Sequence, residues 1–249
     1  MKRITLLINC NDRQGIIAAV TNFIQQQKGN IVYIDQHVDR EDCMFFMRLE
    51  CEFAKEIFSV QEFEADFSEK IAANFHLNWQ LRDSDVKPKM ALFVSKYEHC
   101  LYDILSRYSS KELDVEIPLI ISNHPDLEHI AQNFNIPYYH IKVSKETKEA
   151  AEDLQLKLLK EYKVDFIVLA RYMQIVSSKL IKDYTNNIIN IHHSFLPAFP
   201  GAKPYHSAFK RGVKIIGATS HYVTEDLDEG PIIEQDITRV THTNTIKDF

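Results

Sequence analysis

The chain has 249 residues, which is long enough for one large α/β domain or for a small domain followed by a medium-sized one. Hydrophobic residues make up 45% of it, so a sizeable core can form, and 29 basic residues against 35 acidic ones give a net charge of −6. No basic block stands out, and we therefore expect neither nucleic acid nor an anionic membrane as a partner.

Cysteine usage and the lengths of the apolar runs indicate the compartment. The four cysteines form no CxxC pair, and three of them lie in apolar runs typical of strands; they are Cys10, Cys43, Cys51 and Cys100. We expect free, buried thiols in a reducing environment. No window reaches the roughly 18 apolar residues of a membrane span. The sequence therefore predicts a cytoplasmic protein with no membrane partner.

The first 83 residues alternate between apolar strands and two amphipathic helices. Strands are expected at residues 3–10, 31–38, 43–53 and 76–82. The first helix follows Gly15 and carries apolar residues at helical spacing: Ile16, Ile17, Val20, Phe23 and Ile24. The second carries Ile57, Val60, Phe63, Phe67 and Ile71 on one face. This βαββαβ order predicts a ferredoxin-like antiparallel sheet with both helices on one face.

The polar segment from Asp83 to Lys89 separates this region from the rest of the chain, so we place the domains at 1–83 and 84–249. In the second domain, strands are expected at 90–95, 117–122, 137–142, 164–169, 187–191, 214–222 and 232–238. Helices are expected at 97–110, 126–134, 146–162 and 204–211. Several strands are almost entirely apolar, which predicts a doubly wound, mostly parallel α/β domain that binds ligands at the carboxyl ends of its strands.

Three polar residues near two of these strand ends could act on an acyl carbon. Asn190 and His192 alternate with Ile191, so both side chains leave the same face of their strand. Asp228 lies in an acidic loop after a later strand, and this loop ends at Gly230-Pro231. An amide can donate to an oxyanion, an imidazole can add charge or a proton, and a carboxylate can hold a water. Taken alone, an Asn-x-His on a strand is more often structural, and a single loop aspartate is more often solvated.

Residues 190–206 and 221–231 resemble the signatures of the folate-dependent formyltransferase superfamily. The resemblance implies that Asn190, His192 and Asp228 are the catalytic trio. It also implies that the loop around Met173, Gln174 and Ile175 meets the pterin through its backbone. The loop from His221 to Asp228, with Glu225 and Asp226, would close over the other side of the pterin. No metal and no tightly bound cofactor is implied, because the folate is the substrate.

Within that superfamily the chain most resembles the deformylase branch, which hydrolyses 10-formyltetrahydrofolate to tetrahydrofolate and formate. Residues 35–39 and 45–48 are similar to an ACT regulatory domain, and residues 117–126 and 192–194 also fit that branch. Transformylases that act on glycinamide ribonucleotide have a glycine-rich loop after the first strand of this domain. Residues 94–99 contain no glycine here, so backbone amides cannot easily surround a phosphate. The formate released would supply purine synthesis and balance the one-carbon pool.

The resemblance to ACT domains implies a homo-oligomer controlled by a small amino acid such as methionine or glycine. The effector site would be lined by Asn11, Asp12, Gly15 and Ile16. The turn from Asp12 to Gly15 lacks the proline usual in that family but keeps its glycine. Related chains continue with a helical segment past the position of Phe249, so a further segment is expected there.

Three other interpretations remain open at this point. The chain could transfer the formyl group to an amine acceptor. It could be an amino-acid sensor whose catalytic domain is inactive. It could also be a metal-dependent hydrolase that uses His192, His193, His206 and His221, although neighbouring strand residues such as His192 and His193 point to opposite faces and rarely share an ion.

Overall fold

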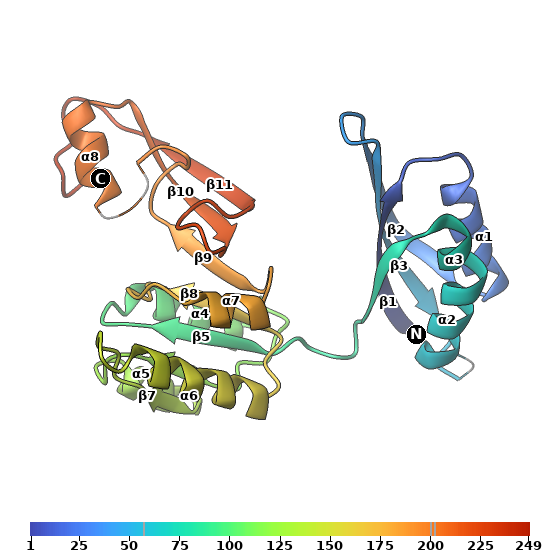
Figure 1. Cartoon of the computed structure of the whole chain (residues 1–249), viewed down its shortest axis with the longest axis horizontal. Helices are drawn as coiled ribbons and strands as arrows, with labels where there is room; N and C mark the ends of the chain where they lie inside the picture. Colours follow the sequence, from blue (N-terminus) through green and yellow to red (C-terminus); the bar gives the residue numbers. More distant parts are fainter. Residues whose placement is uncertain (57, 200, 202) are drawn as a thin grey trace. The chain divides into compact units, whose positions relative to one another are not determined.

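The computed structural model describes residues 1–56, 58–199, 201 and 203–249. Ile57, expected on the second helix, and Pro200 and Ala202 of the 190–206 signature lie outside the described residues. The chain forms two compact units, Met1–Lys87 and Pro88–Phe249, called unit 1 and unit 2 below (Figure 1).

The division falls four residues after the boundary expected from the sequence, because the segment after residue 83 still belongs to unit 1. The Lys2 ammonium lies 2.6 Å from the Asp83 carboxylate and 3.0 Å from that of Asp85. The Ser84 N–H donates to the Arg3 carbonyl at 3.1 Å. These contacts tie the polar segment to the first strand.

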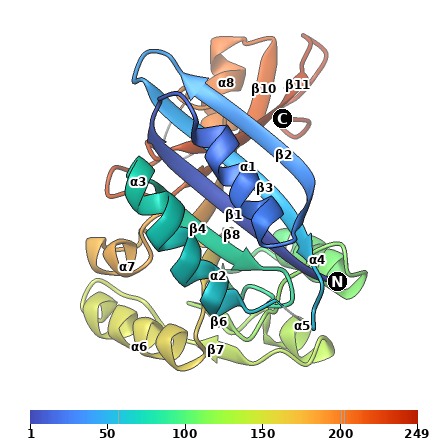
Figure 2. The ribbon, with the colours of Figure 1, turned by 90° about the vertical axis from the view of Figure 1, so that its right-hand side faces the viewer.

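Unit 1 is a four-stranded antiparallel sheet in the order β2-β3-β1-β4, and Figure 2 shows its helices on one face of that sheet. Its strands are β1 (Lys2–Asn11), β2 (Asn30–Asp39), β3 (Met44–Phe53) and β4 (Asn78–Asp83). Its helices are α1 (Ile16–Gln26) and α2 (Val60–Phe67), and α2 runs on through a π-helical turn, η1 (Ser68–Ala72), into α3 (Ala73–Phe75). The predicted βαββαβ order and antiparallel sheet are therefore present.

Alternate residues of β1 and β3 pack against the helices and form the core of unit 1. Phe63 of α2 is 2% exposed, and its ring lies 5.3 Å from that of Phe23 on α1. Ile17 was expected on the buried face of the first helix, but it is 42% exposed because it lies beside the buried stripe that Ile16 and Val20 occupy. The expectation of buried thiols was also wrong for Cys43, which is exposed in the turn before β3.

Unit 2 contains a seven-stranded sheet in the order β11-β10-β9-β8-β5-β6-β7. Its first five strands in the chain are β5 (Met90–Val94), β6 (Ile120–Ser122), β7 (Tyr138–His140), β8 (Phe166–Ala170) and β9 (Ile188–His192), which pair in parallel. Strands β10 (Ile215–Tyr222) and β11 (Ile232–Arg239) extend the sheet in antiparallel fashion. The helices are α4 (His99–Ser109), α5 (Glu128–Asn133), α6 (Lys148–Glu161), α7 (Ser178–Asp183) and α8 (Pro204–Arg211).

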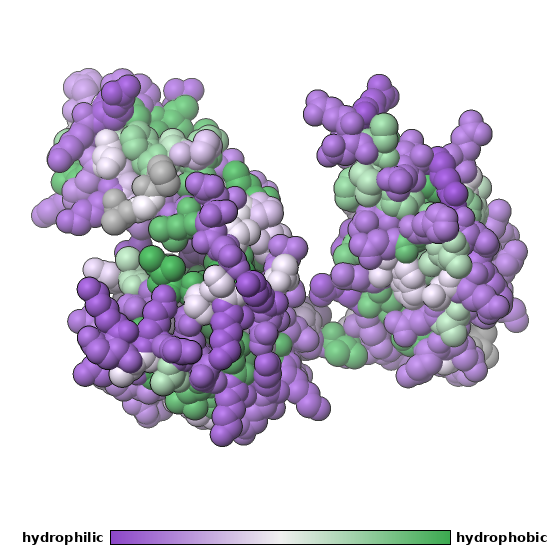
Figure 3. Space-filling view, in the orientation of Figure 1, coloured by the Kyte–Doolittle hydropathy of each residue, from purple (hydrophilic) through white to green (hydrophobic). Residues whose placement is uncertain are grey.

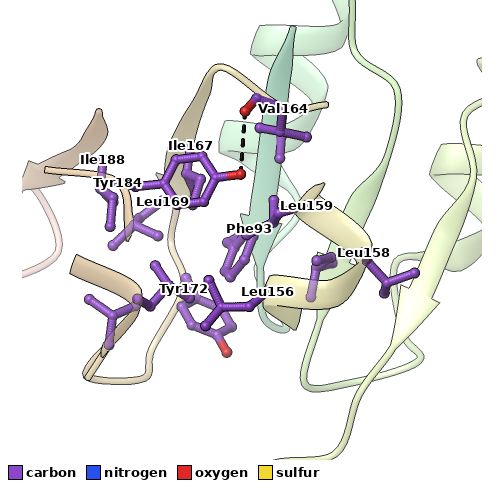
Figure 4. Close-up of a cluster of buried hydrophobic side chains, with 14 of the residues drawn as sticks. Phe93, Leu156, Leu158, Leu159, Val164, Ile167, Leu169, Tyr172, Tyr184 and Ile188 are labelled. Carbon is purple, nitrogen blue, oxygen red and sulfur yellow. Dashed lines mark hydrogen bonds between the residues drawn. The ribbon is translucent and has the colours of Figure 1, made fainter. Parts of the chain in front are cut away.

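Strand β5 is buried on both faces, as a doubly wound domain requires. Ala91 and Phe93 pack on the side of α6 and α7, whereas Leu92 and Val94 pack on the side of α4 and α5. Figure 4 shows the first of these clusters, in which the Tyr184 hydroxyl donates to the Val164 carbonyl at 3.3 Å. The predicted mostly parallel α/β fold is confirmed by this arrangement.

The antiparallel end of the sheet is more exposed than its centre. Hydrophobic residues gather on the visible face of the region formed by α8, β10 and β11 (Figure 3). Ile232 and Ile237 of β11 are each 50% exposed. No helix among the described residues is long and apolar enough to cross a membrane. Several of the buried polar residues of unit 2, among them His192, Thr219 and His221, lie farther in, where β9 and β10 meet.

Candidate active site

Strands β9 and β10 bring four polar side chains together by their register. Asn190 pairs with His221, and His192 pairs with Thr219. Ile191 between them is 55% exposed, whereas His192 is 6% exposed, so the strand alternates as the sequence predicted. Because the pairing is antiparallel, these four side chains lie side by side at the end of β9.

Asp228 reaches this group from the loop between β10 and β11. Its side chain is 6% exposed, and one carboxylate oxygen lies 3.4 Å from His192 Nδ1. The other oxygen lies 3.8 Å from His221 Nε2. The Gly201 N–H donates to the Asp228 carboxylate at 3.2 Å. The three residues predicted as a catalytic trio therefore converge with His221, which the sequence placed on the pterin side.

His221 is 2% exposed and connects to Asn190. Its Nδ1 lies 3.0 Å from the Tyr222 carbonyl oxygen, which can only accept, so Nδ1 carries a proton. In the neutral ring, Nε2 then accepts from the Asn190 amide, whose nitrogen lies 3.3 Å away. This bond uses one of the two N–H groups of Asn190. The second N–H remains able to donate to a substrate oxygen.

Thr219 holds the loop that follows β9. Its side chain is fully buried, and its hydroxyl donates to the Ser194 carbonyl at 2.8 Å. The same hydroxyl accepts from the Leu196 N–H and from the Gln235 amide, each at 3.0 Å. One donor and two acceptor positions are thus all satisfied. Sequence reasoning missed this residue, although a threonine among apolar neighbours on the face of β10 that carries His221 was the available signal.

The loop after β8 is held in place by the buried side chains of Ser95 and Asn123. The Ser95 hydroxyl donates to Asn123 Oδ1 at 2.6 Å and accepts from the Met173 N–H at 3.0 Å. These contacts join the carboxyl ends of β5, β6 and β8. Met173 and Ile175 are 57% and 63% exposed, so their apolar side chains are accessible to a ligand.

The remaining residues expected to contact the pterin lie at the surface. Gln174 is half-buried beside Met173, whereas Glu225 and Asp226 are exposed. Glu225 lies 3.6 Å from the Lys182 ammonium. The Asp226 carbonyl accepts from the Thr224 hydroxyl at 3.1 Å, which shapes the loop rather than the reaction centre. These two acids are therefore separated in environment from the buried Asp228.

A second polar cluster, absent from the sequence predictions, adjoins the trio. Arg171 Nη1 lies 3.3 Å from His193 Nδ1, and its guanidinium lies 5.1 Å from the centre of the Tyr97 ring. The rings of His192 and His193 are 5.5 Å apart, as are those of His193 and Tyr205. Burial and then the Arg171 charge lower the pKa of His193. We call these four residues, Tyr97, Arg171, His193 and Tyr205, the arginine cluster.

The four histidines named for a metal-dependent hydrolase do not form a metal-binding site. In the part of the chain that the structure describes, no three His, Cys, Asp or Glu side chains are placed to hold an ion together. His193 contacts the Arg171 cation instead of sharing a ligand position with His192. The four-histidine arrangement therefore finds no support in the geometry.

The residues expected to bind an effector lie in unit 1 at the start of α1. Asn11, Asp12 and Gly15 are exposed, and Gly15 has a φ of +93°, which a residue with a side chain rarely adopts. Ile16 is only 1% exposed, because the buried face of α1 begins at its first residue, so its side chain belongs to the core. Only the backbone of Ile16 could then line an effector site, which stays a prediction.

Comparison with known proteins places these features in a family. Residues 88–249 match the formyl transferase family. A formyltetrahydrofolate deformylase of Synechocystis sp. is 51% identical over 98% of this chain and 86% of its own length. The chain belongs to the formyltetrahydrofolate deformylase family.

Solved structures agree with that assignment and separate two branches. A formyltetrahydrofolate deformylase from Pseudomonas syringae is 46% identical, covers 100% of this chain and 83% of its own, and superposes with a TM-score of 0.95. A phosphoribosylglycinamide formyltransferase from Bacillus halodurans is 34% identical and covers 64% of this chain and 84% of its own, with a TM-score of 0.60. The deformylase therefore shares both units, whereas the similarity to the formyltransferase covers about two thirds of the chain.

Proposed function

We propose that the chain hydrolyses 10-formyltetrahydrofolate to tetrahydrofolate and formate. The observation that carries this proposal is the convergence of Asn190, His192 and Asp228 in a chain that matches deformylases over both units. In the reaction, a water oxygen bonds to the formyl carbon and the bond from that carbon to N10 breaks. One water proton goes to N10, and the other is released as formic acid ionises.

Each member of the trio has one part in this reaction. Asp228 holds the attacking water and accepts its proton through Oδ1. This oxygen lies 3.8 Å from His221 Nε2, too far for a hydrogen bond, so it is available to the water. Asn190 donates its free N–H to the oxygen of the tetrahedral intermediate. His192 lies beside the Asp228 carboxylate and supplies the proton that N10 takes as it leaves. The proton that Asp228 took from water then passes to His192 across the 3.4 Å between them, which restores both groups. No tightly bound cofactor and no metal enters this scheme.

The direct test is formate release from 10-formyltetrahydrofolate with water as the only acceptor. We expect formate and tetrahydrofolate in equal amounts, at a rate that a chelator does not change. Formate that appears only after an amine or nucleotide is added would contradict hydrolysis.

Transfer to an amine is the second candidate, and the loop after β5 argues against a phosphorylated acceptor. This loop contains no glycine, and its Tyr97 side chain lies against Arg171. A dense cradle of backbone amides around a phosphate is therefore not available there. An inactive catalytic unit, the third interpretation, is disfavoured because the trio is assembled, with His192 buried and the side chain of Asp228 only 6% exposed.

We further propose that unit 1 is an ACT-type regulatory domain. Its βαββαβ order and its antiparallel sheet with helices on one face support this assignment. A small amino acid, methionine or glycine, would bind near Asn11, Asp12 and Gly15, and paired sheets would form a homo-oligomer. The enzyme would act in the cytoplasm, where its formate supplies purine synthesis. Light scattering that shows only monomers, together with turnover unaffected by either amino acid, would contradict this arrangement.

A further inference from the structure

The proposed reaction creates a negative charge beside an existing one. The formyl carbon must lie near Asp228 when water attacks, and it leaves as a formate anion. The formate and Asp228 carboxylates would then be neighbours and would repel each other, and water screens this repulsion poorly because the side chain of Asp228 is only 6% exposed. A release path therefore needs a cation that Asp228 does not already neutralise.

Arg171 is such a cation. It makes no ion pair with a carboxylate among the residues that the structure describes, and its Nε is buried with no hydrogen-bond partner there. Its one hydrogen bond within that part of the chain joins Nη1 to His193 Nδ1 at 3.3 Å. The Tyr97 ring supports the guanidinium from a distance of 5.1 Å. The Arg171 guanidinium, a group that binds carboxylates through two parallel N–H donors, is thus held in place with several N–H groups still unused.

The same hydrogen bond sets the protonation of His193. A guanidinium can only donate, so His193 Nδ1 must accept. The proton of the neutral ring is then on Nε2, which becomes a donor. The lowered pKa of His193 agrees with a neutral ring, since burial and the Arg171 charge both disfavour a second proton. Tyr205 packs edge-on against this ring and fixes its orientation.

We propose that Arg171 and His193 form a carboxylate subsite that binds the product formate next to the trio. The Arg171 fork and the His193 Nε2–H donate to the formate oxygens, and the positive charge offsets the repulsion from Asp228. The adjacent His192 and His193 rings, 5.5 Å apart, connect this subsite to the reaction centre. This inference rests on the proposed hydrolysis, because it concerns the product of that reaction.

Formate binding to the resting enzyme tests the subsite without turnover. The probe is 13C-labelled formate, observed by the broadening of its NMR line in a titration. A ligand with three non-hydrogen atoms binds with a Kd of about 1 mM at best. We expect binding in that range for the wild type and a Kd at least about tenfold higher for Arg171→Gln, because a charged hydrogen-bonding partner is removed. Formate inhibition of turnover should weaken by the same factor.

Arg107→Gln is the matched control, because Arg107 lies on the exposed side of α4 and pairs with Asp103 and Glu112. It should bind formate as the wild type does. Should Arg171→Gln fail to fold, Arg171→Lys keeps the charge but lacks the fork, and we expect formate binding to weaken several-fold.

Three results would overturn the subsite: no binding to the wild type at about fifty times the expected Kd, equal binding to wild type and the folded Arg171 variant, or displacement of formate by equimolar chloride. A wild type that binds formate but releases none from 10-formyltetrahydrofolate would instead refute the proposed hydrolysis.

Discussion

At the scale of single residues, the direction of hydrogen bonds decides what each side chain can still do. In the neutral ring, His221 donates from Nδ1 to the Tyr222 carbonyl and accepts from Asn190 at Nε2. This leaves one Asn190 N–H for the oxyanion, whereas the reverse tautomer would leave His221 as a competing donor. Asn190 is therefore a preorganised donor rather than a freely rotating amide.

Asn190→Ala removes that donor. We expect kcat to fall by on the order of 10²–10³, the usual effect of deleting an oxyanion donor. Formate release under saturating substrate measures it. Asn187→Ala is the control, since the side-chain amide of Asn187 donates to the Thr185 carbonyl at 3.2 Å in the exposed turn before β9. Turnover within about threefold of the wild type in Asn190→Ala would remove Asn190 from the mechanism.

Tyr172 predicts a loss of stability at high pH. Burial raises its pKa to about 12, from an ordinary value near 10. Between pH 10 and 12 the unfolded chain loses this proton while the folded chain keeps it. The free energy of unfolding therefore decreases as pH rises, by about 2 kcal/mol over that range from this group.

Tyr172→Phe removes the ionisable group but keeps the ring against Phe93, 5.2 Å away. The decrease in stability between pH 10 and 12 should then be smaller than in the wild type. Urea denaturation followed by far-UV circular dichroism at pH 10, 11 and 12 measures the two slopes. Equal slopes in both proteins would contradict the assignment of this effect to Tyr172.

The sequence predicted some of these residues and not others for physical reasons. The convergence of Asn190, His192 and Asp228 could be predicted because their signatures are local. Arg171 could not, since its role depends on a φ of +60° and on contacts with loops from two other strands. The burial of the Ile16 side chain was not anticipated, because an exposed turn and a buried helix face meet at this residue.

At the scale of elements, the loop between β10 and β11 depends on one glycine. A Cβ on Gly230 would lie 1.7 Å from the Tyr222 carbonyl oxygen, which is backbone and cannot move aside cheaply. The Tyr222 N–H in turn donates to the Pro231 carbonyl at 2.9 Å. The close approach at Gly230 therefore sets the path of the chain that carries Asp228.

Gly230→Ala should displace this loop. We expect formate release to fall by at least about tenfold, since misplacement by about 1 Å can cost 10²-fold, together with a lower melting temperature. Gly212→Ala serves as the control, because Gly212 has a φ of +70° but no atom within 4 Å of an added Cβ. It should lower stability by about 1 kcal/mol and leave turnover intact. Equal activity in both variants would contradict the role of Gly230.

Element boundaries were predicted less well than element order. Strands expected at 117–122 and 137–142 pair only as Ile120–Ser122 and Tyr138–His140. Pro118 and Pro137 lie before these ladders, and a proline has no N–H to donate to a neighbouring strand. Helix α7 (Ser178–Asp183) was not predicted, because its six residues show no full repeat of the apolar pattern.

At the scale of the whole molecule, each unit has its own hydrophobic core. Among the residues that the structure describes, the core cluster of unit 1 consists of unit 1 residues, and the core clusters of unit 2 consist of unit 2 residues. The single tryptophan of the chain, Trp79, lies in unit 1 with its ring 4.9 Å from that of Phe67. Tryptophan fluorescence therefore reports the folding of unit 1, whereas turnover reports unit 2. Apart from α7, the order of elements in both cores could be predicted from apolar periodicity.

Phe63→Ala should separate the two signals. The ring is 2% exposed, so its loss destabilises unit 1 by about 3–5 kcal/mol. The urea midpoint from Trp79 fluorescence should decrease, while the midpoint from formate release changes less. Ile17→Ala is the control, because Ile17 is 42% exposed on the same unit. Equal decreases in both midpoints would show that the units unfold as one.

The most direct test of the proposed hydrolysis compares two aspartates of one loop. Asp228 is buried beside His192, whereas Asp226 is exposed two residues earlier. Formate release should fall by about 10²–10⁴ in Asp228→Asn, because a neutral amide cannot accept the proton of water. Asp226→Asn should keep most of its kcat, because any loss of pterin contacts from this exposed carboxylate should appear in KM. Near-normal release from folded Asp228→Asn would contradict the central claim that this carboxylate activates the water.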